Sequence, residues 1–402
     1  MSKTWTHMIA AIMAWSLSSA AVASAQNQPP SFDVFAPYTA DSETMIDYQV
    51  WSEMLEAITF DVGMSDRYVP KGRIIETGSR ITGQSTSRYR TEGNRVIFHL
   101  LEDFHKEAIS SYRQDLEVLP DSMPLSNLGR NEQLAYWINL HNVIVIDEIA
   151  KRYPLRNVDR IRLEDGGSLH EGHVTTIQGV PLSLNDIRLN IVARHWDNPV
   201  VLYGFFSGGV SSPSLQARAY TGTNVMRLLN RNAEEYVNAL RGVENTAPPL
   251  RVSPMYFEAQ HMFPNWPQDL IAHLDRFADD DVAELLEGSN RVVRSQYDWN
   301  VADLTNGAGP CGGGVRRNIE QVAGVSSGSE GSASSLAGCN PIPPTTRNFI
   351  VDVQQRRLRL LRSGQLGRVI VTDIATEDSD HSRSGGAQGQ LVDRDDNPPE
   401  GR

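Results

Sequence analysis

Cysteine and long apolar runs are scarce in this 402-residue chain. Only two cysteines are present, and after the first 25 residues no apolar run is long enough to span a bilayer. Basic residues are in the minority, with 37 Lys and Arg against 49 Asp and Glu. An acidic chain is a poor binder of nucleic acid or anionic lipid through its overall field, so we expect neither partner. No motif indicates a cofactor, and we expect none.

The first 25 residues have the order of a secretory signal peptide. Lys3 precedes an apolar run at 8–17, and small residues follow, ending in Ala-Ser-Ala at 23–25. The run is shorter than the roughly 20 residues of a spanning helix, which favours cleavage over an uncleaved anchor. We therefore expect a periplasmic or secreted protein that begins at Gln26. Cleavage would remove Lys3, so 36 of the 37 basic residues would remain against 49 acidic ones, a formal net charge of −13.

The two cysteines, Cys311 and Cys339, flank a stretch rich in glycine and serine. An even pair in an oxidising compartment predicts a disulfide. Closing a loop of that length would stabilise the fold by about 3 to 4 kcal/mol. Two thiols without nearby histidines do not make a zinc site, so we expect no metal here.

Residues 131–153 are the segment around which the chain is expected to pack. Apolar residues point in every direction around this predicted helix, so it has no face for water. Asn139, His141 and Asn142 are set into it, and burying such groups without partners costs roughly 1 to 3 kcal/mol. We predict that Asn139 and Asn142, one turn apart on one face, both bind the backbone of a turn at 207–213.

Helices come first in the chain and strands mixed with helices follow, which favours an α+β fold with a small mixed or antiparallel sheet. Apolar spacing predicts further helices at 45–60, 95–116, 184–195, 223–240 and 268–277. Runs rich in β-formers predict strands at 158–163, 174–177, 200–206, 251–257 and 291–299. Pro120 with Pro124 is expected to prevent the helix at 95–116 from continuing. Ser183 with Asp186 resembles a capping box for the helix at 184–195, and Thr223 is a candidate cap for the next one.

The composition also predicts how the chain is divided. The expected parts are a signal peptide at 1–25, an extended lead-in at 26–44, one domain at 45–303, a Gly/Ser-rich segment pinned by a disulfide at 304–345, a basic and apolar appended strand or helix pair at 346–372, and a disordered acidic tail at 373–402.

The sequence SGGVSSP at 207–213 is the first candidate site. A glycine pair after a predicted strand lets backbone N–H groups point into a concavity, where a hydroxyl can act as a nucleophile or hold an anion. The spacing is not the GxSxG of a nucleophile elbow, so that family is not supported. A plain tight turn is the competing interpretation.

Histidine is the natural base to look for, and five lie in the predicted domain. They are His141, His170, His173, His195 and His261. His170 and His173 would share a helix face as metal ligands, but the glycines around them favour a loop. His195 ends a predicted helix, where the dipole favours a capping cation over a catalytic base. A satisfied core histidine is the competing interpretation of His141.

Tyr297, Asp298 and Trp299 form the last candidate. Strand alternation sends Tyr297 and Trp299 to one face and Asp298 to the other. The plain interpretation is two packed rings and a solvated or capped acid. The functional alternative is an acid that faces Asn139 and Asn142.

Four separated segments, in order, resemble a family known only as domain of unknown function 547. They are AYWINLHN at 135–142, GVPLSLNDI at 179–187, SGGVSSP at 207–213 and YDW at 297–299. The resemblance covers roughly 45–303 and implies an exported bacterial member without an assigned activity. Relatives often have cysteines where this chain has Ser207 and Ser212, and many have Ile-Glu-His at 187–189, which is Ile-Arg-Leu here. If relatives use a papain-like cysteine and histidine, this chain has lost both.

Three functional hypotheses follow. The first is a non-catalytic or catalytically altered domain that binds a peptide, glycan or envelope protein; the expected binding residues are Asn139, Asn142, Ser207, Ser211, Ser212 and Asp298. The second is a hydrolase or acyl transferase with Ser212 as nucleophile and His141 or His195 as base. The third is a purely structural module of the cell envelope.

Overall fold

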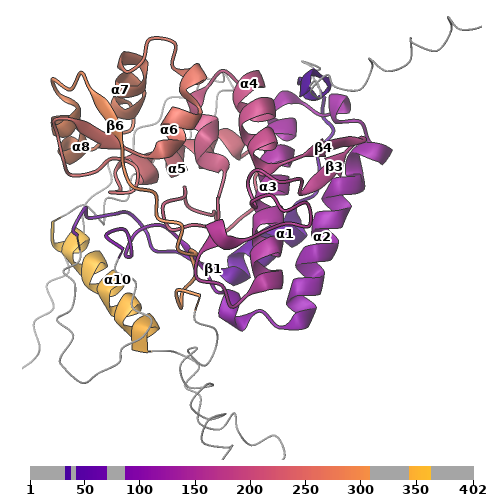
Figure 1. Cartoon of the computed structure of the whole chain (residues 1–402), viewed down its shortest axis with the longest axis horizontal. Coiled ribbons are helices and arrows are strands. Elements are labelled where there is room, and N and C mark those ends of the chain that lie inside the picture. Colours follow the sequence, from indigo (N-terminus) through magenta and orange to yellow (C-terminus); the bar gives the residue numbers. More distant parts are fainter. Residues whose placement is uncertain (1–31, 38–41, 70–86, 308–343, 364–402) are drawn as a thin grey trace, which may run out of the picture.

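One helix passes through the interior of the protein, and the other elements pack around it (Figure 1). The computed structural model describes residues 32–37, 42–69, 87–307 and 344–363. Helix α3, Arg130–Arg152, corresponds to the helix predicted at 131–153, and every residue from 132 to 150 is buried. It ends before Pro154, which disfavours helical geometry in the preceding residue. The prediction of a buried central helix is confirmed.

Helices of varied length and two-stranded sheets make up the rest of the described fold. The other α-helices are α1 (Gln49–Ile58), α2 (Asp103–Ser122), α4 (Ala193–His195), α5 (Val225–Val237), α6 (Pro254–Glu258), α7 (Gln268–Asp275), α8 (Asp280–Leu286) and α10 (Pro344–Arg362). The 3-10 helices are η1 (Phe32–Phe35), η2 (Phe98–Leu100), η3 (Leu125–Asn127), η4 (Val158–Arg160), η6 (Pro199–Gly204) and η7 (Gln260–Met262), and η5 (Asp186–Val192) is a π-helix.

The strands form three separate pairs rather than one sheet. Strands β1 (Thr59–Phe60) and β2 (Arg95–Val96) are antiparallel, as are β3 (Thr175–Ile177) and β4 (Val180–Leu182), whereas β5 (Leu250–Val252) and β6 (Val292–Arg294) are parallel. The mixture of helices and small sheets confirms the predicted α+β class.

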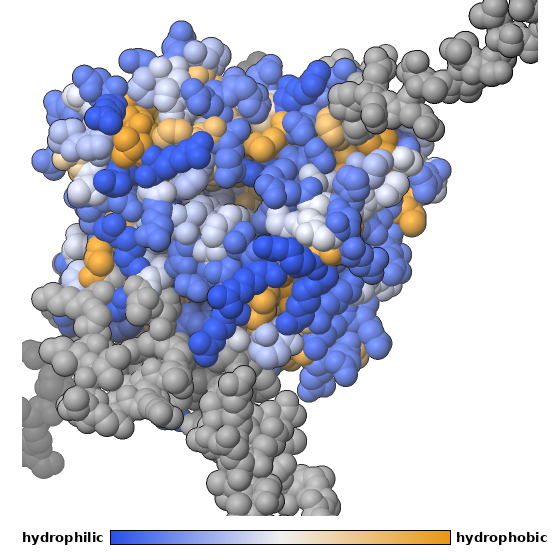
Figure 2. All heavy atoms as spheres, in the orientation of Figure 1, coloured by the Kyte–Doolittle hydropathy of each residue, from blue (hydrophilic) through white to orange (hydrophobic). Residues whose placement is uncertain are grey.

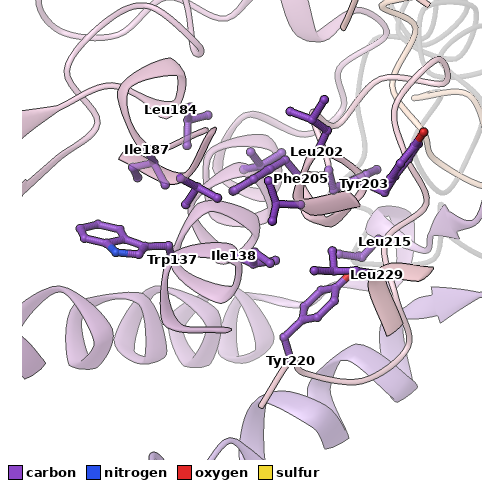
Figure 3. Close-up of a cluster of buried hydrophobic side chains, with 14 of the residues drawn as sticks. Trp137, Ile138, Leu184, Ile187, Leu202, Tyr203, Phe205, Leu215, Tyr220 and Leu229 are labelled. Atoms are coloured by element: carbon purple, nitrogen blue, oxygen red, sulfur yellow. The ribbon is translucent and has the colours of Figure 1, made fainter. Parts of the chain in front are cut away.

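Apolar side chains from several elements meet against α3 (Figure 3). Gly204, the last residue of η6, lies between a side chain of α3 and one of α5. A Cβ atom at this position would lie 2.8 Å from Ile138 Cδ1 and 3.0 Å from Leu229 Cδ2. Only glycine lets η6 pass between the two helices, which brings the chain to the start of the turn at 207–213.

The helix predicted at 95–116 is displaced along the chain. Residues Arg95–Val96 pair with β1, so α2 begins only at Asp103 and continues to Ser122, through Pro120. Proline leaves the carbonyl four residues before it without its helical partner. That carbonyl, of Leu116, accepts a hydrogen bond from the Tyr136 hydroxyl of α3 at 3.0 Å. The helix ends before Pro124, as predicted, but it passes through Pro120 because a side chain of α3 replaces the missing donor.

Two of the predicted strands are also wrong. Residues 158–163 and 200–206 contain the 3-10 helices η4 and η6 instead. Asn157 and Asn198 precede them, and each side chain accepts a hydrogen bond from the backbone N–H two residues later. Such asparagine turns favour helical over extended geometry at the start of an apolar run.

The predicted helix starts have mixed outcomes. Ser183 and Asp186 form the predicted capping box, with Asp186 N–H donating to Ser183 Oγ at 3.0 Å and Ser183 N–H donating to Asp186 Oδ2 at 2.9 Å. At the start of α5 the reciprocal pair is Thr221 with Asn224, so the assignment of Thr223 as the cap is wrong. The runs at 251–257 and 291–299 are strands only over β5 and β6, and Ser253 caps α6 directly after β5.

Residues 297–304, here called the closing segment, form backbone hydrogen bonds with three other segments of the chain. Val158 N–H donates to Trp299 O on one side at 2.9 Å, and Val210 N–H donates to Asn300 O on the other at 2.8 Å. Val96 N–H donates to Ala302 O at 2.9 Å. The YDW sequence is therefore held directly against the turn at 207–213.

Helix α10 occupies the described part of the segment at 346–372, where a strand or a helix pair was predicted, and residues 364–372 lie outside the described ranges. Its Arg356 is buried and donates to the carbonyls of Val62 and Thr91. Within the described ranges, no helix is long and apolar enough to cross a membrane. The side of the protein drawn in Figure 2 is mostly polar, with scattered apolar patches. The predicted signal peptide, the Cys311–Cys339 pair and the acidic tail lie outside the described residues.

Candidate functional site

The two asparagines of α3 position different segments of the chain. Asn142 Nδ2 donates to Gly204 O at 2.9 Å, and its Oδ1 accepts from Phe206 N–H at 3.0 Å. Asn139 makes the same pair of bonds to the backbone of Tyr220, at 2.7 and 3.1 Å. Both amides are buried.

The prediction that Asn139 and Asn142 both bind the backbone of the turn at 207–213 is wrong. Residues three apart on a helix differ by about 60° in direction around its axis. The side chains of Asn139 and Asn142 therefore reach different segments of the chain. Asn142 fixes the residues that enter the turn at 207–213, whereas Asn139 fixes the segment that leads from the turn to α5.

His141 supports the position of Asn142. Its Nδ1 donates to Asn142 Oδ1 at 3.1 Å, and its ring packs edge-on against Phe205 with centroids 4.9 Å apart. Burial lowers the pKa of His141 well below its usual value, and the nearby His170 lowers it further. A neutral, enclosed imidazole that orients Asn142 matches the core interpretation.

Ser212, the predicted nucleophile, is only 2% exposed. Its Oγ accepts from Ser207 N–H at 2.7 Å and donates to Pro213 O at 2.9 Å. No histidine of the described residues hydrogen-bonds this hydroxyl. His195 lies at the end of α4, where its carbonyl accepts from Arg130. The structure therefore does not bring Ser212, His141 and His195 together, and the Ser212 hydroxyl closes the turn.

Ser211 and Asp298 join the turn to the closing segment. Asp298 N–H donates to Ser211 Oγ at 2.8 Å, and Ser211 N–H donates to Asp298 O at 3.2 Å. The Asp298 carboxylate accepts from Asn300 N–H at 2.9 Å. This geometry matches the capped acid of the plain interpretation; the carboxylate makes no hydrogen bond to Asn139 or Asn142.

Gly208 lets the turn fit against α3. Its φ is +84°, and an added Cβ would lie 2.5 Å from Ile149 Cδ1. A side chain at this position would meet both backbone strain and a collision with the core. As a result residues 208–213 are buried, and Ser207 is the member of the turn that reaches the surface.

Ser207 belongs to a half-buried group of four residues, here called the aromatic–hydroxyl cluster: Ser207, His170, Tyr297 and Trp299. Ser207 Oγ lies 2.7 Å from the Tyr297 hydroxyl, and His170 Nε2 donates to Ser207 O at 3.1 Å. The Trp299 ring centroid lies 4.4 Å from that of Tyr297 and 5.4 Å from that of His170. The indole N–H of Trp299 has no hydrogen-bond partner among the described residues and is open to solvent.

The electrostatics of this cluster favour neutral groups. Burial, helped by the charge of Arg188, lowers the pKa of His170 to about 4. Burial raises the pKa of Tyr297 to about 12. At neutral pH the imidazole is therefore uncharged and the phenol keeps its proton, so Tyr297 is no base for the Ser207 hydroxyl. The cluster can stack on a ligand and hydrogen-bond it, and the group that contacts Ser207 Oγ is the protonated phenol of Tyr297.

Sequence reasoning found only part of this cluster. The alternation of the YDW sequence places Tyr297 and Trp299 on one face, as predicted. Ser207 was named as a binding residue, whereas His170 was considered as a base or a metal ligand and not as a neighbour of Ser207. Among the described residues, no three His, Cys, Asp or Glu side chains converge as a metal site would require.

A charged cavity lies elsewhere, between α2 and the C-terminal end of α3. It has a volume of about 330 Å³ and contains Arg113. This guanidinium is bound to Glu117, Asp147 and Glu148 at 2.6 to 2.8 Å. Because its cations Arg113, Lys151 and Arg152 are paired with carboxylates, this cavity fits a structural ion network.

Residues 125–237 match the model of a family described as a protein of unknown function, DUF547. The matched range runs from η3 to the end of α5 and includes α3, the GVPLSLNDI element and the turn at 207–213. No curated protein and no solved structure matches the chain. The match supports a domain of this family within the chain and assigns it no activity.

Proposed function

We propose that the DUF547 domain of this chain is a non-catalytic binding module of an exported protein and that it binds a glycan at the aromatic–hydroxyl cluster. The observation that carries the proposal is the Ser207–Tyr297 hydroxyl pair at 2.7 Å, set beside the half-buried ring of Trp299. The signal-like pattern at 1–25 supports export.

Glycans suit this chemistry because a sugar ring has an apolar C–H face and a rim of hydroxyls. The apolar face packs on an aromatic ring, while the hydroxyls exchange hydrogen bonds with serine, tyrosine and indole N–H groups. Such sites combine an apolar surface with a few placed polar groups. Trp299 offers both a ring and a free N–H donor.

A peptide or a protein partner fits the cluster less well. An extended peptide adds to a free strand edge, but the closing segment is paired on both sides, with Val158 and with Val210. A protein interface needs a contiguous apolar centre. The large exposed apolar side chains include Phe104 on α2 and Leu361 on α10, which are other parts of the fold.

We expect Trp299→Ala to weaken glycan binding at least about tenfold, because it removes the stacking surface and one donor. The measurement is titration of the purified chain with a panel of neutral and acidic trisaccharides, followed by calorimetry. Trp266→Ala, a half-buried tryptophan packed on Phe257 and Phe263, is the matched control and should retain affinity. Equal affinity of Trp299→Ala and the wild type for every sugar that binds would contradict the proposed site.

We further expect no covalent labelling of the chain by a fluorophosphonate probe between about pH 6 and 9. Such probes react with a serine that a base activates, and the Ser212 hydroxyl is enclosed and bonded to Ser207 N–H and Pro213 O. Mass spectrometry of the labelled chain makes the measurement. Labelling that disappears in Ser212→Ala but not in Ser207→Ala would revive the serine hydrolase hypothesis.

A further inference from the structure

Helix α10 is anchored to the fold by one side. Val353, Arg356 and Leu360 recur every three or four residues, and each is at most 4% exposed. The Arg356 guanidinium donates to the carbonyls of Val62 and Thr91. Because this side is fixed, the opposite side of the helix is turned away from the domain, and Figure 1 shows α10 at the edge of the fold.

The opposite side, here called the outer face, combines apolar and basic side chains: Arg347, Val351, Leu358, Leu361 and Arg362. The steps from 347 to 351, 351 to 358, 358 to 361 and 358 to 362 are the spacings that keep side chains on one side of a helix. The three apolar side chains are 43%, 50% and 53% exposed, in chain order. Single exposed apolar residues are ordinary, whereas three in register on one helix indicate a contact surface.

The charge of the outer face is positive. Arg347 and Arg362 are exposed and, within the described ranges, form no ion pair. No acidic residue occupies any of the positions that make up this face. Salt screens charges beyond about 8 Å at physiological ionic strength. These two arginines therefore count for more at the outer face than the net charge of −12 on the whole chain does.

The acids near α10 lie at its flanks. Arg359 pairs with Asp66 at 2.7 Å, and Arg357 donates to the Asp61 carbonyl at 2.8 Å. Asp352, the acid within α10, is half-buried and lies about 100° around the helix from the residue before it. These contacts orient the flanking arginines toward the fold and leave the outer face without a carboxylate.

We propose that the outer face of α10 docks the protein on an anionic lipid surface. Val351, Leu358 and Leu361 enter the boundary between headgroups and acyl chains, and Arg347 and Arg362 bind the phosphates beside them. The expectation of no anionic lipid partner considered the charge of the whole chain, and the charge of this helix reverses it. The inference is independent of the proposed glycan site.

Charge and patch shape disfavour other occupants of the outer face. A second copy would set Arg347 and Arg362 against the same arginines, with no acid on either face to pair with them. A protein partner needs a contiguous apolar centre, whereas arginines lie among the apolar side chains here. A lipid surface accepts separate apolar side chains and supplies negative headgroups along the whole helix.

Vesicle flotation of the chain from Gln26 onward, the form that signal cleavage would leave, tests the inference. This form lacks the apolar run at 8–17, which could bind vesicles by itself. The vesicles are phosphatidylcholine alone, or phosphatidylcholine and phosphatidylglycerol in equal parts. We expect binding to the mixed vesicles that weakens as salt is added, and much weaker binding to phosphatidylcholine alone.

Substitutions on the outer face separate its two contributions. Leu358→Gln combined with Leu361→Gln should lower the affinity for mixed vesicles about tenfold. Arg362→Gln should lower it about fivefold, and Arg362→Lys should retain it. The controls are Phe104→Gln, 60% exposed on α2, and Arg227→Gln, exposed on α5, and both should leave binding unchanged. Circular dichroism should show that every variant folds as the wild type does.

Three results would overturn the inference. The first is no binding to mixed vesicles at low salt. The second is binding that the outer-face variants leave as strong as the controls do, because the contact would then lie elsewhere. The third is a dimer in light scattering that Leu358→Gln with Leu361→Gln abolishes, which would assign the outer face to a second copy of the chain.

Discussion

Replacing Arg241 by methionine is expected to lower the free energy of unfolding by about 3 to 5 kcal/mol, the cost of removing one partner of a buried ion pair. Arg241 is fully enclosed, and it donates from Nε to Ser212 O and from Nη2 to Ser214 Oγ, each at 3.0 Å. Its ion-pair partner is Glu235. Methionine fills a similar volume but leaves the Ser212 carbonyl without its donor and the Glu235 carboxylate without its cation, with only Ser214 Oγ still donating to it.

The effect of this substitution should reach the turn at 207–213, because Arg241 holds the carbonyl of Ser212. Chemical denaturation followed by circular dichroism measures the change. Arg251→Met, an exposed arginine on β5, is the matched control and should shift stability by less than about 0.5 kcal/mol. A loss below about 1 kcal/mol for Arg241→Met would mean that the ion pair is not needed for the fold.

The central helix was predictable because its signal is local. An apolar pattern on every side of a helix requires burial whatever surrounds it, so α3 needs no knowledge of its partners. The runs at 158–163 and 200–206 were not predictable, because a short buried apolar run suits a strand and a tight helix equally well. The side chains of Asn157 and Asn198 favour the 3-10 helix by accepting hydrogen bonds from backbone N–H groups two residues later. These bonds can form only when the backbone has the turn conformation.

The candidate site shows a similar division. Alternation along the YDW sequence predicts that Tyr297 and Trp299 share a face, and their rings lie 4.4 Å apart. Which serine of the turn faces outward depends on the left-handed φ of Gly208 and on a closing segment about ninety residues away in the chain. Neither is encoded in the local pattern, so Ser212 and Ser207 could not be distinguished from the sequence alone.

Buried arginines were also beyond the sequence. Arg95 and Arg241 are both fully buried, although arginine is usually a surface residue. Backbone carbonyls compensate Arg95, which donates to the carbonyls of Glu92 and Gly93 at 2.7 and 2.8 Å. Such compensation depends on loop carbonyls that turn inward, and no spacing rule predicts it.

Asn139→Ala and Asn142→Ala are each expected to lower the free energy of unfolding by about 2 to 4 kcal/mol, because each orphans one buried N–H and one buried carbonyl. Asn142 serves Phe206 and Gly204, whereas both partners of Asn139 belong to Tyr220. The exposed Asn190 of η5, replaced by alanine, provides the control.

The two substitutions should differ in where they loosen the native state, which hydrogen exchange resolves residue by residue. Asn142→Ala should speed exchange at the amide of Phe206 and spare that of Tyr220, while Asn139→Ala should do the reverse. If both variants instead loosened the amides of 207–213 equally, the two asparagines would act on one common turn after all. If both variants are as stable as the Asn190 control, the side-chain amides of α3 do not hold the chain at the Ser207 turn. The proposed site would then lack the rigid support that it requires.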